Sequence, residues 1–307
     1  MRNYIIRRLL LSIIVLWAVS TVVFCMMRLL PGDPVAVMLQ TSGGSAERIA
    51  TLRHQLGLDQ PAYVQYGRFL SGIIHGDLGR SLFTGRPVLE MILEQFSATV
   101  QLAAASMVLG LVVGLFLGII SALHEGSWVD NLCMVLAATG VSVPHFWLGL
   151  MLIFTFSLKL GWLPATGQGG IQRLIMPATV LGLTLAATVA RLTRSSLMEV
   201  MQQEHITTAR AKGLRERVVV SRHALKNALI PVVTIVGLEF GWLIGGAVVT
   251  ETVFSRQGLG RLAVQAVLWK DFPLVQGTVL FAAIFYVSIN LGVDILYAFL
   301  DPRISTQ

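Results

Sequence analysis

Residues 191–226 read RLTRSSLMEVMQQEHITTARAKGLRERVVVSRHALK and separate two apolar runs. This segment carries eight Lys or Arg residues against three Glu residues. A polar stretch of this length cannot lie in hydrocarbon, so it must lie in water if its flanks cross a membrane. Such a segment is where a soluble partner could meet a membrane protein, and its centre reads Thr208-Ala209-Arg210-Ala211-Lys212-Gly213-Leu214.

The composition is that of an integral membrane protein. Of the 307 residues, 55% are hydrophobic and only 13% are charged, and the mean hydropathy is +0.74. A soluble chain with this balance would aggregate. The net charge of +7 does not indicate a nucleic-acid partner, because the bases flank apolar runs instead of forming one stripe with interleaved aromatic residues.

Six apolar runs are long enough to cross ~30 Å of hydrocarbon as helices. They lie near residues 9–30, 99–123, 132–158, 174–192, 229–250 and 275–299. The first run follows Arg2, Arg7 and Arg8, as a signal peptide does, but its length and the lack of a small-x-small cleavage site favour an uncleaved signal-anchor. The sequence predicts an all-α membrane protein with six transmembrane helices and both termini on one side.

The distribution of Lys and Arg predicts which side that is. Short cytoplasmic loops carry an excess of these residues, whereas long translocated loops such as 31–98 are exempt. Twelve bases lie on the side of the termini and five lie opposite. The termini are therefore expected in the cytoplasm, although the loop His124–Asn131 has no Lys or Arg to support or oppose this.

The basic segment predicts two helices joined by a glycine turn. Residues 194–212 contain neither Pro nor Gly, and their apolar residues recur at helical spacing: Leu197, Val200, Met201, Ile206 and Ala209. Gly213 is expected to end this helix, and a second helix is expected over 214–229. Such a knuckle suits insertion into a groove on a partner. The alternative is a basic face that lies on anionic lipid headgroups.

Small residues recur at every fourth position in three of the runs. These stripes let helix backbones approach closely. They fit ordinary packing of one bundle or surfaces that slide as the bundle moves between states. Their members are Ser106, Gly110, Gly114, Gly118 and Ala122; Ala178, Gly182, Ala186 and Ala190; and Gly237, Gly241 and Gly245.

Motifs of enzymes and metal sites are missing from the sequence. There is no GxxxxGK[ST] phosphate loop, no HExxH pair and no GxSxG elbow. The six histidines are scattered, and Cys25 and Cys133 lie in apolar runs where they are expected to be inert. We expect neither catalysis nor a bound cofactor or metal in this chain.

Ionisable residues inside membrane spans are costly and are candidates for function. Here they are Glu239 in the fifth run and Asp294 in the sixth, with His145 and Asn290 as polar companions. Glu239 shares its helix with Gly237, Gly241 and Gly245 and could contact a substrate in a translocation pathway. The two acids could also be structural anchors, or could couple transport to protons in a secondary transporter. We take Glu239, Gly241, Gly245, Asn290 and Asp294 as candidate pathway residues.

Several stretches along nearly the whole chain resemble the first permease subunit of bacterial ATP-binding-cassette importers of the dipeptide, oligopeptide and nickel class. Jointly they are highly specific. They are Leu30-Pro31-Gly32-Asp33-Pro34, Leu56-Gly57-Leu58-Asp59-Gln60-Pro61, Gly76-Asp77-Leu78-Gly79, Ala190-Arg191-Leu192-Thr193-Arg194-Ser195-Ser196, Thr208–Leu214, His223–Pro231, Gly258-Leu259-Gly260-Arg261 and Asp301-Pro302-Arg303.

The family's coupling motif is written EAA-x3-G, followed nine residues later by I-x-L-P. Placed on Gly213, the motif puts Thr207-Thr208-Ala209 at the EAA triplet, so only the last alanine and the glycine match. His223-Ala224-Leu225-Lys226 keeps only the leucine of I-x-L-P. The resemblance implies that the ATPase-coupling residues are Thr207, Thr208, Ala209, Arg210, Ala211, Lys212, Gly213 and Leu214.

The resemblance also implies the assembly. The fold would be that of a type I importer permease in the bacterial inner membrane. The partners would be a second similar permease, two cytoplasmic ATPases that hold the ATP and Mg²⁺, and a periplasmic binding protein. Residues 1–30 would form the cytoplasmic tail and first span, residues 31–98 a periplasmic region, and residues 99–307 the core with a coupling segment at 193–229.

The expected substrate is a short peptide. Selectivity in such systems is largely set by the binding protein, so nickel or another metal chelate, or glutathione, stays open as an alternative. The scattered histidines offer no metal pathway, which favours peptides.

Overall fold

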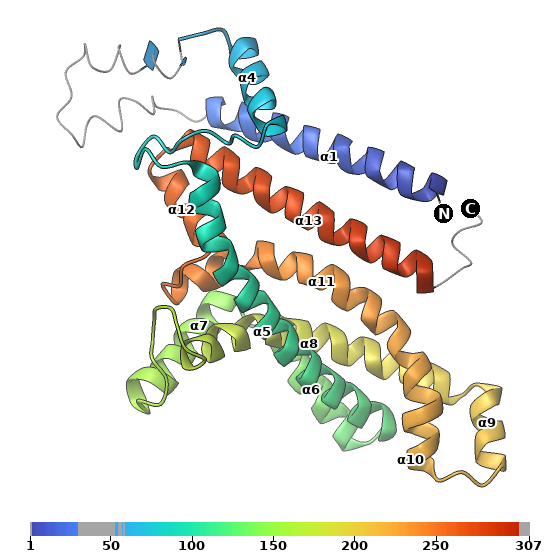
Figure 1. Cartoon of the computed structure of the whole chain (residues 1–307). Coiled ribbons are helices and arrows are strands. Elements are labelled where there is room, and N and C mark those ends of the chain that lie inside the picture. The colour runs from blue at the N-terminus through green and yellow to red at the C-terminus, as the bar shows by residue number, and fades with distance from the viewer. Residues whose placement is uncertain (1, 30–52, 55–56, 58, 301–307) are drawn as a thin grey trace. The chain divides into compact units, whose positions relative to one another are not determined.

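The computed structural model describes residues 2–29, 53–54, 57 and 59–300 (Figure 1). The stretches Leu30–Pro34 and Asp301–Arg303, together with Leu56 and Leu58, lie outside these residues. The described regular structure is helical, with loops between the helices and one isolated bridge between Arg80 and Pro87. The described residues form two compact units, one from those up to residue 99 together with 257–291, and the other from 100–256 together with 292–300.

Five helices are long and apolar enough to cross a membrane, as judged over the described residues. They are α1 (Arg2–Leu29), α5 (Val88–Leu123), α8 (Gln172–Met201), α11 (Leu225–Val253) and α13 (Phe272–Leu300). A sixth span results if the bent pair of α6 (Trp128–Ser142) and α7 (His145–Leu152), which η1 (Ile153–Lys159) continues, is counted as one. The prediction of an all-helical membrane fold is confirmed.

The apolar run at 132–158 differs from the predicted single helix, because the chain bends by 103° between α6 and α7. Val143 has an extended backbone (φ −91°, ψ 125°) and precedes Pro144. Proline disfavours a helical conformation at the residue before it and has no N–H to donate within a helix. The third span is therefore discontinuous.

The first unit has a core of aliphatic residues where α5, α12 (Leu259–Leu268) and α13 begin. Val88, Ile92 and Leu274 are fully buried there. The buried carboxylate of Asp271 accepts hydrogen bonds from Ser81 Oγ, from Leu82 N at 3.2 Å and from Leu274 N at 3.3 Å. One carboxylate thus fixes the loop before α5 to the start of α13.

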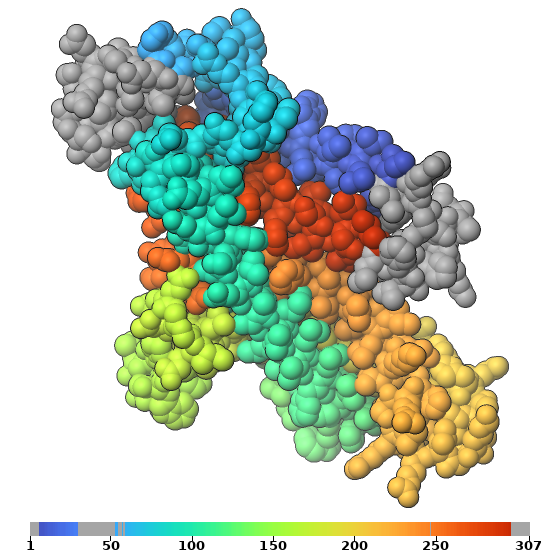
Figure 2. All heavy atoms as spheres, in the orientation of Figure 1, coloured from blue at the N-terminus to red at the C-terminus, as the bar shows by residue number. Residues whose placement is uncertain are grey.

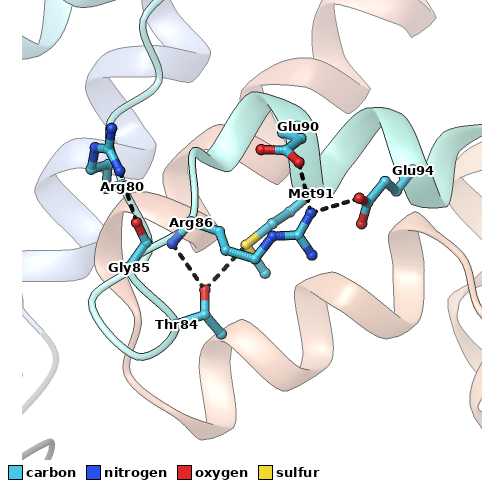
Figure 3. A network of polar contacts seen from close by, with 7 residues as sticks. All are labelled: Arg80, Thr84, Gly85, Arg86, Glu90, Met91 and Glu94. Atoms are coloured by element: carbon cyan, nitrogen blue, oxygen red, sulfur yellow. Dashed lines mark hydrogen bonds and ion pairs between the residues drawn. The ribbon is translucent and has the colours of Figure 1, made fainter.

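A second polar network in this unit lies at the start of α5 (Figure 3). Arg86 Nη2 donates to Glu90 Oε1 at 3.0 Å and to Glu94 Oε1 at 2.6 Å. These bonds raise the pKa of Arg86. All three side chains are about half exposed, so water and salt screen both ion pairs and their contribution to stability is small.

The second unit is organised around α8, which packs against α6 and α11. The glycine stripe of α5 lies directly on α8. A Cβ atom added at Gly114 would lie 2.8 Å from the Ala186 carbonyl oxygen and 2.7 Å from Val189 Cβ, and one added at Gly118 would lie 2.7 Å from the Ala190 carbonyl oxygen. The glycines of α5 therefore allow close packing on α8, which is the first of the two interpretations of the small-residue stripes.

Candidate functional site

The basic segment begins differently from its prediction. Instead of one helix over 194–212, α8 continues to Met201, and a separate short helix, α9 (Glu204–Ala211), follows. Gln203 between them has an extended backbone (φ −74°, ψ 150°). The chain turns here because the apolar face of α9 must fold back onto α8 and not continue along its axis. No Gly or Pro marks this break.

Buried residues hold α9 against its neighbours. Ile206 is fully buried and Ala209 is nearly so. They pack in one cluster with Leu197 and Val200 of α8, Val219 and Ala224 of η2 (Val219–Ala224), and Ala228 of α11. The predicted apolar stripe is therefore confirmed as the inward face. Ala209 supports α9 from beneath and is not available to a partner.

A tight turn follows α9, as predicted. Gly213 has φ +78°, and its N–H donates to the Arg210 carbonyl oxygen at 2.9 Å. This left-handed conformation favours glycine and commonly ends helices. The chain then re-enters helix at α10 (Glu216–Val218), which leads through η2 into α11. We call residues 203–216 the α9 turn.

An ion pair closes the α9 turn. Arg210 donates from Nε to Glu216 Oε2 at 3.2 Å and from Nη2 to Glu216 Oε1 at 2.7 Å. The pair raises the pKa of Arg210. Both side chains are about half exposed, so its contribution to stability is small, at most ~1 kcal/mol. Its two parallel hydrogen bonds join the end of α9 to the start of α10.

The remaining residues of the predicted coupling segment are exposed: Thr207, Thr208, Arg210, Ala211, Lys212, Gly213 and Leu214. Figure 2 shows this part of the second unit as a surface with protruding side chains. Leu214 leaves 39% of its surface open beside the cationic Lys212 and Arg215. We call these exposed residues the tip of the α9 turn; they form a mixed apolar and basic surface above the buried Ile206 and Ala209. An exposed surface that buried residues hold in place suits a docking element.

One polar network at the same end of the unit was missed by the sequence reasoning. Arg194 of α8 donates from Nε to Asp130 Oδ1 and from Nη2 to Asp130 Oδ2, each at 2.8 Å. Asp130 lies in the first turn of α6, is only 4% exposed, and also accepts from Ser121 Oγ and from Gly126 N at 3.0 Å. The sequence offered one signal for this network, which is the acidic residue Asp130 just before the apolar run at 132–158.

This network also locates the loop that carried no Lys or Arg. Because Asp130 contacts Arg194, the α5–α6 connection lies at the end of α8 from which α9 emerges. An alternating six-span topology requires this arrangement.

The candidate pathway residues are not gathered into one site. Glu239, Gly241 and Gly245 lie on α11, where Glu239 is half-buried, Gly241 is buried and Gly245 is exposed. Asn290 and Asp294 lie on α13 and are half-buried, with Asn290 in the first unit and Asp294 in the second. A Cβ atom at Gly237 would lie 2.7 Å from Val293 Cγ2, so α11 and the end of α13 touch near Glu239 and Asp294. Among the described residues, no three His, Cys, Asp or Glu side chains are grouped so as to hold a metal ion.

Two family patterns match this chain. The pattern of the binding-protein-dependent transport system inner membrane component matches residues 114–306, and that of the N-terminal part of such membrane components matches residues 1–103. The chain belongs to this family. It is the permease of an ATP-binding-cassette importer of the oligopeptide class, a multi-pass, non-catalytic component of the inner membrane. A transport system of this family includes ATPase and binding-protein partners.

Relatives align along almost the whole chain. The glutathione transport system permease protein GsiC of Escherichia coli O6:H1 (strain CFT073) is 45% identical over 304 residues, which are 99% of each chain. The proteins of the same name from Escherichia coli K12 and from Salmonella paratyphi A are 44% and 45% identical over the same length.

Solved structures share the fold at lower identity. The inward-facing MetNI methionine ABC transporter matches with a TM-score of 0.58 and 19% identity, over 69% of this chain and 96% of that one. An amino acid ABC transporter crystallised with histidines matches with a TM-score of 0.52 and 17% identity, over 76% of this chain and 98% of that one. The importer-permease fold is therefore shown.

Proposed function

We propose that this permease carries glutathione into the cytoplasm as one half of a transmembrane pathway, and that the α9 turn receives the movement of the ATPases. The observation that carries the substrate is the 44–45% identity to proteins named as glutathione permeases along 99% of the chain. Glutathione stood as an alternative in the sequence analysis, and the comparisons favour it over di- and oligopeptides or nickel chelates.

The packing of α9 supports its role in coupling. Ile206 joins α9 to α8 and α11 through one buried cluster, so a push on the turn is delivered to both helices. Packed interfaces of this kind have discrete alternative arrangements and do not deform continuously. Closure of the ATPases around the exposed tip would shift α8 and α11 together, and would thereby switch the access of the pathway.

The remaining features of the assembly follow from this role. We infer that a second permease completes the pathway, that both termini are cytoplasmic, and that residues 31–98 meet the binding protein. The Lys and Arg distribution supports this orientation. The location of the α5–α6 connection beside the end of α8 supports the alternating topology, since it lies on the same side as α9. The division into 1–30, 31–98 and 99–307 remains a proposal of the same kind.

A secondary transporter was the alternative of another class. It rested on Glu239 and Asp294 as proton carriers. Membership in an ATP-driven family removes the main argument for this alternative, because ATP hydrolysis then supplies the energy and proton coupling through these two acids is not needed.

The substrate is tested by competition in proteoliposomes that hold the permeases, the ATPases and the binding protein. ATP-dependent uptake of labelled glutathione is expected to fall about tenfold in a large excess of unlabelled glutathione, by mass action. The same excess of dialanine or of a nickel–histidine complex is expected to leave uptake nearly unchanged. Equal suppression by dialanine would return the assignment to general peptides, and uptake without nucleotide would contradict the ATP-driven mechanism.

A further inference from the structure

The break between α6 and α7 leaves one carbonyl without its helical partner. In a continuous helix the N–H of residue 144 would bind the carbonyl of Gly140, but Pro144 has no N–H. Thr184 of α8 takes over this role, because its Oγ1 donates to the Gly140 carbonyl oxygen at 3.1 Å. The bent span is therefore stabilised from α8 at the place where it bends.

The same hydroxyl fixes the imidazole of His145. His145 Nε2 lies 2.8 Å from Thr184 Oγ1. The single hydroxyl proton of Thr184 goes to Gly140, so its oxygen must accept here and Nε2 must carry the proton. In the neutral ring Nδ1 then holds a lone pair, and no described residue donates to it. His145 thus presents an acceptor to its surroundings.

Trp242 of α11 packs against the His145 ring, and Glu239 lies one turn before Trp242 on the same helix. The Trp242 ring lies edge-to-face with His145 at a centroid distance of 6.1 Å, and 42% of its surface stays exposed. Glu239, which is half-buried, precedes Trp242 by three residues and lies on a neighbouring part of the same helix surface. An imidazole lone pair, an indole ring and a carboxylate all attract ammonium groups.

The bend and its neighbours Thr184 and His145 lie deep in the membrane-spanning part of the unit. Thr184 precedes Arg194 by ten residues on the continuous helix α8, or about 15 Å, which is half of the hydrocarbon thickness. Irregular backbone at such depth is tolerated only where it is buried in protein or lines a water-filled cavity. The bend before His145 is such an irregular backbone, so this part of the span lies against protein or a water-filled cavity of the assembly. His145 and Trp242, which are not fully buried, lie beside it.

We propose that His145 and Trp242, with Glu239 beside them, form the station in the translocation pathway that receives the ammonium group of the passing peptide. Thr184 is the positioning residue for His145. This inference rests on the proposed function, since it supplies a pathway residue set for a short peptide with a free amine. It places the contact at the bend of the third span, where the sequence analysis named only Glu239 as a candidate and His145 as a companion.

A charge-selective labelling experiment tests this chemistry without relying on the binding protein. Gly245→Cys places a thiol one turn beyond Trp242, at an exposed position with open space around it, in a chain with Cys25 and Cys133 replaced by serine. In the assembled transporter, a cationic methanethiosulfonate is expected to label this thiol about tenfold faster than an anionic one, after each rate is divided by that for a free thiol. His145→Ala combined with Trp242→Leu should reduce this preference severalfold, whereas Phe146→Ala, a change at the exposed neighbour, should not.

Absence of labelling, or a cation preference that the double variant leaves unchanged, would overturn the proposal. The positioning role of Thr184 has its own readout. Thr184→Val should reduce the preference as the loss of His145 does, and Thr184→Ser, which keeps the hydroxyl, should retain it. If glutathione is not transported by the wild-type complex at all, the proposed substrate fails while the labelling preference can still be measured.

Discussion

Replacing Asp130 by alanine is expected to destabilise the second unit by about 3 kcal/mol. The change removes the carboxylate that binds Arg194, Ser121 and Gly126 and leaves a guanidinium in a partly buried place. The expected cost is at the lower end for a broken buried pair, because Arg194 is 28% exposed and can be partly hydrated. A thermal-unfolding scan of the purified complex should show a fall of several degrees in its midpoint.

Two further variants separate this pair from surface charges in general. Glu90→Ala removes one partner of an exposed pair and should leave the thermal midpoint nearly unchanged. Combining Asp130→Ala with Arg194→Leu should recover much of the loss, because no unpaired charge remains. If Asp130→Ala were as mild as Glu90→Ala, the network would not hold α6 to α8.

The second large effect is expected at the tip of the α9 turn. Ala211→Trp adds bulk to an exposed position at the end of α9, where a groove on the ATPase would have to close around it. We expect ATP-dependent uptake to fall at least tenfold, while the amount of assembled permease and its thermal midpoint stay at wild-type values. A tenfold loss corresponds to about 1.4 kcal/mol in the coupling step, which is a modest steric penalty for an interface.

Ala211→Ser is the matched control, since it keeps the side chain small at the same position. It should transport normally. Loss of the permease from the membrane with Ala211→Trp would assign a folding role to the tip, and normal uptake would remove it from the coupling interface.

The spans were largely predictable because length and hydropathy decide them. The runs at 99–123, 229–250 and 275–299 correspond to α5, α11 and α13, and each helix extends beyond the apolar run at one or both ends. These extensions are polar or amphipathic turns that pack on other parts of the protein. In α5, for example, the extension contributes Val88 and Ile92 to the core of the first unit. Hydropathy does not report such turns, so helix ends could not be read from it.

The bend of the third span could not be derived from Pro144 alone. Pro177 and Pro231 also lie in apolar runs, and both remain inside continuous helices, α8 and α11. At Pro144 the bend is supported by contacts that are distant in sequence, including Thr184 on the freed carbonyl and Gly149 against Val253 and Phe254. Tertiary packing decides which proline breaks a helix.

The candidate site was predicted in outline and not in detail. The apolar stripe with Ile206 and the glycine turn at Gly213 were visible as local patterns. The break at Gln203 was not, because it follows from the burial of Ile206 and Ala209 against α8 and α11. Asp130 was treated as a loop residue, since its partner Arg194 is 64 positions away in the sequence.

The central claim is that the tip of the α9 turn docks on the ATPase. A photo-crosslinking amino acid at position 208 tests it most directly, with position 162 as the control. Thr208 is exposed on α9, which follows the C-terminal end of α8. Trp162 is 67% exposed in the connection that precedes α8, so it lies at the opposite end of this 30-residue helix (Figure 1). After irradiation of membranes that hold the whole transporter, we expect an adduct with the ATPase from position 208 and none from position 162. An equal yield from both positions, or no ATPase adduct from position 208, would contradict the account.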